Sequence, residues 1–263
     1  MAFLVTCEHG SQQIPDWLSQ HFADSAPATT DSDAGVSNDP CDLGALDAAN
    51  QFARQLGCPM VSAKYSPSVI DVNRSTQQRG VFSATTRSLS RKLRQRIVSE
   101  IHAPYRREVE SAVERQVKKD GIVIHLSIHS FATFESSQSV TEGEDRALTA
   151  RRTDVGLLYD PARAYELALC LDWYEDLYYS LPMLRVRRNY PRRGVSESLI
   201  RTLRQKYSPD CYIGVELQLN RAWCVRDVPV RKKVFKGIAK SLVRVCTAAQ
   251  NDASQDDREQ EAA

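Results

Sequence analysis

The segment Gly121-Ile-Val-Ile-His-Leu-Ser-Ile-His129 decides the fold class of this chain. Its near-continuous apolar character is typical of a strand that is buried on both faces, as in the middle of a parallel sheet. Strand-like and helix-like patterns alternate along the chain on both sides of this segment. Alternating β and α segments in one unit predict an α/β fold, a three-layer sandwich with a mainly parallel or mixed central sheet.

The other expected elements surround this strand in sequence. Strands are expected at 3–6, 60–63, 69–72, 155–159, 183–186 and 212–219, and helices at 15–22, 42–56, 89–119, 161–178, 196–206 and 228–248. Pro104 should bend or break the long charged helix, because proline removes a helical hydrogen bond. The segments 23–40 and 132–150 are polar, and their length would allow them to act as lids.

The composition is that of an ordinary globular protein, 42% hydrophobic and 26% charged over 263 residues. The net charge of +2 implies neither nucleic-acid nor membrane-surface binding. The seven cysteines form no CxxC pair, and their odd number argues against a disulfide framework. We see no signal peptide and no apolar stretch near the ~20 residues that span a bilayer, so we expect a cytoplasmic protein. One domain is expected at 1–249, followed by a disordered acidic tail at 250–263.

Polar side chains stand where four of the predicted strands end. They are Glu8-His9, Asp71-Val-Asn73-Arg74, His129-Ser130 and Glu216. Ligands bind at the carboxyl ends of strands in open α/β sheets, so four such placements favour one shared site. A charged glutamate inside an apolar strand would be costly without a partner, so Glu216 needs a cation, a metal or a proton. Taken alone, Glu216 is more simply explained by a structural ion pair.

The histidines differ in how strongly they indicate a metal site. His9 follows a short strand and enters a glycine turn, where a metal ligand and an ordinary loop histidine are about equally favoured. Of the two histidines in the 121–129 strand, His129 is the better ligand candidate, because it lies at the strand end. His125 lies in mid-strand and is more simply a buried, hydrogen-bonded histidine. His21 and His102 have helical, charged surroundings and are expected at the surface.

Several charged groups have ordinary structural explanations. Asp42 opens a predicted helix, where an N-cap would need no further role. Arg192 and Arg193 are explained by a solvated turn, and Arg152 and Asp154 by pairing with one another.

Seven short motifs follow one another between residues 3 and about 219. They are Glu8-His9-Gly10, Asp42-Leu-Gly44, Ser68-Val-Ile-Asp71-Val-Asn73-Arg74, Ile128-His129-Ser130-Phe131, Asp154-Val-Gly-Leu-Leu-Tyr159, Asn189-Tyr-Pro191 with Gly194, and Gly214-Val-Glu216-Leu. Each motif is weak alone, but in this order and spacing the set resembles the N-formylglutamate amidohydrolase family. That family is similar in fold to the zinc-dependent exopeptidases. The resemblance implies a metal-assisted hydrolase that cleaves an N-acyl amide bond.

The resemblance also implies roles in the reaction. His9, Asp42 and His129 correspond to the ligands of one zinc ion, with a fourth position left open for water. Zinc would lower the pKa of that water and polarise the amide carbonyl. Glu216 resembles the general base that takes the proton from the attacking water and passes it to the leaving amine. Glu8 is a weaker metal candidate, because other members carry an uncharged residue before the histidine.

Substrate contacts are implied by the same resemblance. Asn73-Arg74 resembles an Asn-Arg pair that grips the substrate carboxylate, a role that suits a planar guanidinium. Arg152 and Asn189 fall in matched motifs and are further substrate contacts, each less favoured than a structural role. The chain departs from the family at Arg106, where a histidine is frequent.

The expected reaction is hydrolysis of an N-acyl amino acid, such as N-formylglutamate to formate and glutamate. A dicarboxylate should need two cationic contacts, Arg74 and one unassigned arginine. Two alternatives stay open: a zinc peptidase or amidase acting on a larger substrate, and a carboxylate-binding protein that has lost catalysis. The sequence does not decide the oligomeric state.

Overall fold

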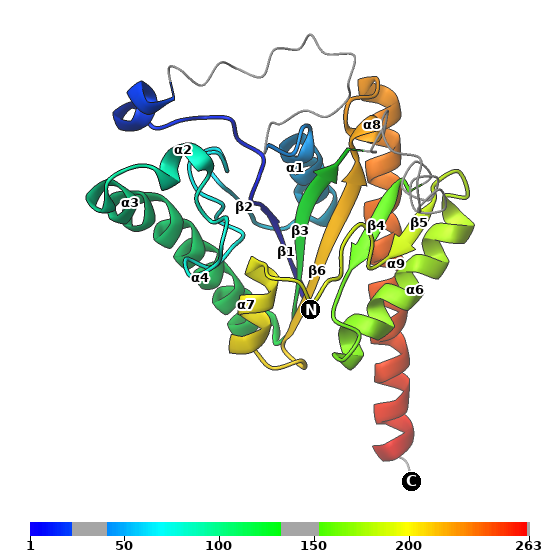
Figure 1. Ribbon diagram of the computed structural model, residues 1–263. Coiled ribbons are helices and arrows are strands. Elements are labelled where there is room, and N and C mark those ends of the chain that lie inside the picture. Colours follow the sequence, from blue (N-terminus) through cyan, green and yellow to red (C-terminus); the bar gives the residue numbers. More distant parts are fainter. Residues whose placement is uncertain (23–40, 133–152, 262–263) are drawn as a thin grey trace, which may run out of the picture.

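A six-stranded sheet forms the centre of the computed structural model, which describes residues 1–22, 41–132 and 153–261 (Figure 1). The strands are β1 (Ala2–Cys7), β2 (Met60–Ser62), β3 (Val123–Phe131), β4 (Val155–Leu158), β5 (Val186–Arg188) and β6 (Tyr212–Asn220). Their order across the sheet is β2-β1-β3-β6-β4-β5, and only the pairing of β4 with β6 is antiparallel within the described sheet. The predicted α/β class with a mainly parallel or mixed sheet is therefore confirmed.

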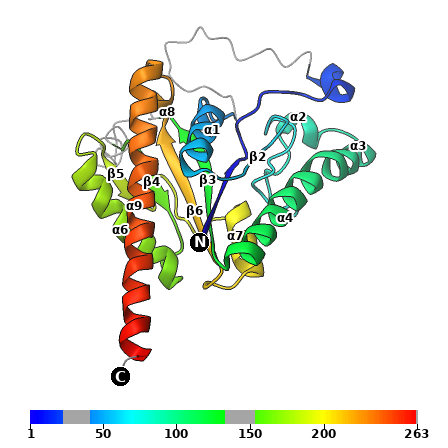
Figure 2. The same cartoon turned by 180° about the vertical axis from the view of Figure 1, so that it is seen from behind.

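Helices cover both faces of the sheet (Figure 2). One face packs against α1 (Ala45–Leu56), α6 (Ala164–Ser180) and α9 (Val228–Glu261). The other packs against α4 (Ala103–Asp120) and α7 (Leu199–Lys206). The shorter helices are α2 (Ala84–Arg87), α3 (Arg91–Ile97) and α8 (Arg221–Cys224), together with a 3₁₀ turn at Asp16–His21. Among the described helices, none has an apolar stretch that could cross a lipid bilayer.

The two central strands explain why the 121–129 segment reads as almost continuously apolar. β3 and β6 are nine residues long, pair with each other in parallel and are buried along nearly their whole length. Their side chains alternate between two covered faces, so neither strand has a solvent-facing side.

The two faces of the sheet differ in chemistry. The face under α1, α6 and α9 is apolar in β1, β3 and β6 except at Ser130, near the end of β3. The face under α4 and α7 is apolar where the strands begin, at Leu4, Val123 and Tyr212, and carries mostly polar side chains beyond them. Those polar side chains are each at most 5% exposed: Thr6, Glu8, His125, Ser127, His129, Glu216 and Gln218.

Two expectations, the strand at 69–72 and the position of His102, differ from the observed fold. Segment 69–72 is buried but forms turns, so the predicted strand is wrong. Asp71 is the reason, because its side chain accepts a hydrogen bond from the backbone N–H of Asn73 and so competes with strand pairing. His102 is 6% exposed, so its predicted surface position is wrong. It lies in a π-helical turn, and its Nε2 atom is 2.8 Å from the carbonyl oxygen of Arg74.

The long charged helix and the C-terminal segment can also be compared with their predictions. The predicted break at Pro104 is not present, because the chain is helical without a gap from α3, which ends at Ile97, through a π-helical turn over Val98–His102 to α4, which begins at Ala103. Pro104 lies in the first turn of α4, where proline is tolerated. α9 continues to Glu261, where a disordered tail from residue 250 was expected. Residues 250–261 include no glycine or proline that would end a helix. The predicted loop and lid segments 23–40 and 133–150 lie outside the described residues.

A buried ion pair joins α6, α7 and β6 beneath the polar half of the sheet. Glu166 is fully buried, and its Oε1 atom accepts hydrogen bonds from Arg204 Nε at 2.9 Å and from the backbone N–H of Gly214 at 3.1 Å. Arg204 also donates to the carbonyl oxygens of Gly194 and Gly214. The pair therefore holds the loop that precedes α7 against the central sheet.

We predict that Arg204→Met destabilises the protein by about 3–5 kcal/mol, because it removes the hydrogen-bonded cation of the buried Glu166 and leaves only Arg163, whose Nε atom is 3.3 Å from Glu166 Oε1. Arg201→Met is the matched control on the same helix. It removes only a partly exposed pair with Glu197 and should cost less than about 1 kcal/mol. Urea unfolding of both variants measures the difference, and equal losses would contradict this assignment.

Candidate metal centre and active site

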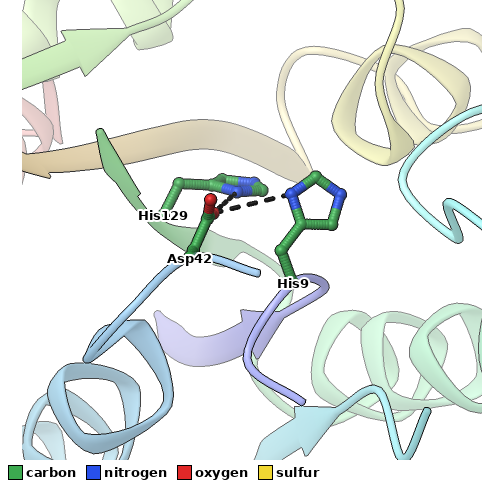
Figure 3. Close-up of side chains that lie close together, drawn as sticks. All are labelled: His9, Asp42 and His129. Carbon is green, nitrogen blue, oxygen red and sulfur yellow. Dashed lines mark hydrogen bonds and ion pairs between the residues drawn. The ribbon is translucent and has the colours of Figure 1, made fainter. Parts of the chain in front are cut away.

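Three predicted metal ligands converge at the carboxyl end of the central strands (Figure 3). His9 follows β1, Asp42 precedes α1, and His129 lies in β3. Asp42 Oδ2 is 2.7 Å from His129 Nδ1 and 3.5 Å from His9 Nδ1. Within the described part of the chain, these are the His, Cys, Asp and Glu side chains that gather as a group of three, with ligand atoms within 4.8 Å of one another.

The backbone brings Asp42 to the two histidines. The N–H of Asp42 donates to the carbonyl oxygen of His9 at 2.9 Å, which ties the approach to α1 to the end of β1. Gly10 permits this approach, because a Cβ atom there would lie 2.7 Å from Cys7 Sγ and 2.9 Å from Leu46 Cβ. The N-cap position of α1 belongs to Gly44, so Asp42 does not cap the helix and its carboxylate faces the histidines instead.

In both histidines Nδ1 faces Asp42, and the outer nitrogen, Nε2, has a partner of its own. His9 Nε2 is 2.8 Å from Asp71 Oδ1. His129 Nε2 is 3.0 Å from Ser127 Oγ, which donates to Glu8 Oε2 at 2.7 Å. A carboxylate or hydroxyl on the far nitrogen is the usual support of a metal-binding histidine, because it orients the ring and leaves the other nitrogen free. The chemistry of this donor set therefore fits a metal ion.

Glu8 lies behind His129 and outside the group of three. Its side chain is fully buried, and it accepts hydrogen bonds from Ser127 and from the Tyr105 hydroxyl at 3.0 Å. Burial raises the pKa of Glu8, but His129 and the hydroxyl donors outweigh burial and lower it overall. Glu8 therefore contacts the ring of His129 from outside the group of three, and its weaker ranking as a metal ligand stays a prediction.

The charged side chains at the site shift the pKa values of their neighbours. Burial opposes the charged form of Asp42, but hydrogen bonds from His129 and His9 hold the pKa of Asp42 well below its usual range. Burial likewise opposes ionisation of Asp71, and its contacts with His9 and Arg74 bring its pKa down to about 2. The pKa of His9 is raised, because the two carboxylates outweigh the effect of burial. The site is therefore rich in negative charge beside its imidazoles, as a cation requires.

Glu216 lies on the same face of the sheet, opposite Ser127 on the neighbouring strand. It is 1% exposed, and its Oε2 atom forms an ion pair with Arg192. Its Oε1 atom has no hydrogen-bond partner among the described residues. The interpretation of Arg192 as part of a solvated turn is wrong, since its guanidinium contacts a buried carboxylate.

The predicted substrate-binding pair lies beside His9 and His129. Asn73 is 4% exposed, with Nδ2 3.5 Å from His129 Nε2 and Oδ1 accepting from the backbone N–H of Leu199 at 2.7 Å. Arg74 is 45% exposed and donates from Nε to Asp71 Oδ2 at 2.8 Å. The same aspartate thus orients both His9 and Arg74, and the turn that carries Arg74 is adjacent to the metal group.

The other two predicted substrate contacts stay predictions. Arg152 lies outside the described residues. Asn189 accepts hydrogen bonds at Oδ1 from the backbone N–H groups of Tyr159, at 3.2 Å, and Gly194, at 2.9 Å. Its carbonyl therefore orders the loop that carries Arg192.

His125 has the structural role favoured by its mid-strand position. It is fully buried, with Nε2 2.8 Å from Thr6 Oγ1 and Nδ1 2.7 Å from the Tyr212 hydroxyl. Burial lowers its pKa to about 4, so the neutral ring is favoured. The expectation of a buried, hydrogen-bonded histidine is confirmed.

Sequence reasoning missed four residues around the site. Ser127 could have been found, because it stands two residues before His129 and so shares its face of the strand. Tyr105 and Arg192 gave no local signal, since each meets its partner only across the fold. Arg106 orders the turn at 72–74 by donating to the carbonyl oxygens of Val72 and Asn73.

Comparisons with known proteins agree with this architecture. The sequence profile of the N-formylglutamate amidohydrolase family matches residues 1–223. The fold is similar to the crystal structure of a gene product from Agrobacterium tumefaciens, with a TM-score of 0.70 and 20% identity over 94% of this chain and 90% of that chain. It is also similar to N-formylglutamate amidohydrolase from Ralstonia eutropha JMP134, with a TM-score of 0.63 and 14% identity over 95% and 94% of the two chains. No curated protein sequence matches this chain.

We predict that the protein binds one divalent metal ion through this group of three. His129→Ala should abolish stoichiometric binding, and Asp71→Asn should weaken it about 10- to 100-fold by releasing the outer nitrogen of His9. His21→Ala changes a histidine of the 3₁₀ turn that is not part of the group, so this variant should bind metal as the wild type does. Equilibrium dialysis with elemental analysis measures the stoichiometry. Full metal content in His129→Ala would contradict the assignment.

Proposed function

The chain belongs to the N-formylglutamate amidohydrolase family, and we propose that it hydrolyses the formyl amide bond of an N-formyl amino acid such as N-formylglutamate. One observation carries the proposal. The three candidate metal ligands lie at the carboxyl-terminal end of one face of the sheet, and Glu216 lies on the same face in the middle of β6, opposite Ser127, with one oxygen that has no partner among the described residues. Metal-assisted hydrolysis of an amide needs both groups together.

The proposed cofactor is one zinc ion held by His9, Asp42 and His129. Two imidazoles and one carboxylate form a donor set that suits zinc and leaves a position open. When bound, zinc supplies Lewis-acid chemistry: it polarises the amide carbonyl and makes water a better nucleophile. Asp71 and the Ser127–Glu8 pair would keep the two rings oriented, because they occupy the outer nitrogens.

Glu216 is the proposed general base. Its Oε1 atom would take a proton from the attacking water as the carbon–oxygen bond forms, and would pass that proton to the amide nitrogen as the carbon–nitrogen bond breaks. The products are formate and the free amino acid. The carboxylate starts the cycle charged although it is 1% exposed, and the contact with Arg192 supports that state.

Asn73 and Arg74 are proposed to bind a carboxylate of the substrate. Their turn lies beside His129 and His9, and a guanidinium can bind a carboxylate through two parallel hydrogen bonds. Arg152 and Asn189 remain proposed contacts of the same substrate. The substrate is a small molecule, and the proposed location is the cytoplasm.

We predict that Glu216→Gln lowers the rate of formyl-amide hydrolysis about 100- to 10,000-fold, because the amide cannot accept the proton. Zinc content and the far-ultraviolet circular dichroism spectrum should stay unchanged. Glu197→Gln, which alters a glutamate of a surface ion pair, is the matched control and should retain full activity.

A substrate panel with added zinc separates this proposal from the two alternatives. N-formyl and N-acetyl amino acids are assayed beside short peptides, with wild-type protein and Glu216→Gln. Preference for peptides would contradict the proposed small substrate and favour a peptidase or amidase that acts on a larger one. Carboxylate binding without hydrolysis of any substrate, unaffected by Glu216→Gln, would instead indicate a non-catalytic binding protein.

A further inference from the structure

Arg192 lies between the buried base and the open side of the site. Its side chain is 34% exposed, whereas that of Glu216 is 1% exposed. The ion pair uses Nη2 of Arg192 and Oε2 of Glu216, and no other hydrogen bond of this guanidinium is found among the described residues. A guanidinium has five N–H donors, so Arg192 keeps donors for a second acceptor.

The loop at 189–194 brings Arg192 to Glu216 in the middle of β6. It crosses β4 at close range, because a Cβ atom at Gly156 would collide with the carbonyl oxygen of Tyr190, and one at Gly194 with the backbone of Tyr159. Arg204 holds Gly194 at the end of this loop through a hydrogen bond to its carbonyl oxygen. The position of Arg192 is therefore set by the fold.

The same loop is joined to the strand that carries His129. The ring of Tyr190 meets the ring of Phe131 edge to face, with centroids 6.2 Å apart, and Phe131 stands two residues after His129 at the end of β3. The guanidinium of Arg187 also contacts the Tyr190 ring, 5.9 Å from its centroid. A molecule bound at the metal group would therefore have an aromatic wall and cationic groups as neighbours.

The ion pair conflicts with the work proposed for Glu216. A guanidinium bound to a carboxylate stabilises its charged form and so makes it a poorer proton acceptor. A general base should lose that contact, or weaken it, when the water attacks. A carboxylate arriving with the substrate is a suitable competitor, because it offers the guanidinium the same charge and the same bidentate geometry.

We propose that Arg192 is the second cationic contact of the substrate: its guanidinium pairs with Glu216 in the free enzyme and with a carboxylate of the amino-acid part of the substrate in the complex. Binding of that carboxylate then releases Glu216 for proton transfer. This inference rests on the proposed function. It defines the substrate class as N-formyl amino acids with a free carboxylate, and it disfavours amides and internal peptide bonds.

Other arginines near the site are less suited to this role. Arg74 is bound to Asp71 and serves as the first contact. Arg188 lies over the ring of Tyr174, 5.5 Å from its centroid. Arg193 is exposed, and its side chain has no described contact with Glu216. Arg193→Gln is therefore the matched control, since it removes the same charge one residue away.

The test measures binding of free glutamate, the expected product, to the zinc-loaded protein by titration calorimetry. Arg192→Gln should weaken binding about 10- to 100-fold, because a hydrogen-bonded charge pair is lost. Arg192→Lys keeps the positive charge but cannot donate two parallel hydrogen bonds to one carboxylate, so it should give an intermediate loss of affinity. Glu216→Gln should strengthen binding at least about threefold, because Arg192 no longer has a competing anion. That gain should vanish in the double variant Glu216→Gln/Arg192→Gln, and Arg193→Gln should bind as the wild type does.

Two analogues identify which carboxylate Arg192 binds. Glutamine lacks the side-chain carboxylate, and glutamate α-amide lacks the α-carboxylate. The analogue whose affinity no longer depends on Arg192 is the one from which the relevant carboxylate has been removed. In kinetics, Arg192→Gln should raise KM for N-formylglutamate. It should leave KM unchanged for the N-formyl analogue in which the carboxylate bound by Arg192 is replaced by an amide.

Two results would overturn the inference. One is that Glu216→Gln fails to strengthen glutamate binding while Arg192→Gln lowers kcat equally for the acid and the amide, since Arg192 would then only orient the base. The other is that no variant binds any of these carboxylates. If glutamate binds in an Arg192-dependent way but no formyl substrate is hydrolysed, the inference holds and the proposed reaction fails.

Discussion

The burial of polar side chains on one face of the central sheet is the constraint on which the rest of the structure depends. These groups are almost completely buried, so leaving them without partners inside the protein would be costly. The partners come from distant parts of the chain: Tyr105 in α4 reaches Glu8, and Arg192 before α7 reaches Glu216. The interactions that hold the helices and loops against this face are therefore the same ones that build the candidate site.

Two carboxylates on this face show how environment separates roles. Glu8 and Glu216 are both almost completely buried. Hydroxyl groups bind both oxygens of Glu8, which suits it to support the ring of His129. Glu216 meets a partly exposed guanidinium at one oxygen and has no described partner at the other, which suits it to the proposed exchange of a proton and a cation. Identical side chains at similar depth thus differ in chemical environment, and we propose different roles for them because of the donors around them.

The candidate metal group and the turn at 73–74 are coupled by Asp71. Its side chain orders the turn through the backbone N–H of Asn73. Its carboxylate also contacts His9 and Arg74. A change in the turn would therefore alter the orientation of a candidate metal ligand, and occupation of the metal group would in turn affect the position of Arg74.

The sequence by itself determined the α/β class, the central position of the 121–129 segment, and most of the residues that stand at the carboxyl ends of strands. Hydrophobic periodicity carries this information, because it reports which side chains are buried and on which face. It failed at 69–72, where a buried apolar run forms turns because Asp71 bonds the backbone locally. Only the tertiary structure decided what each polar group meets: Asp42 faces the histidines and does not cap a helix, and Arg192 covers Glu216. Those contacts depend on the strand order β2-β1-β3-β6-β4-β5 and on loops that cross it, so no local pattern in the chain could encode them.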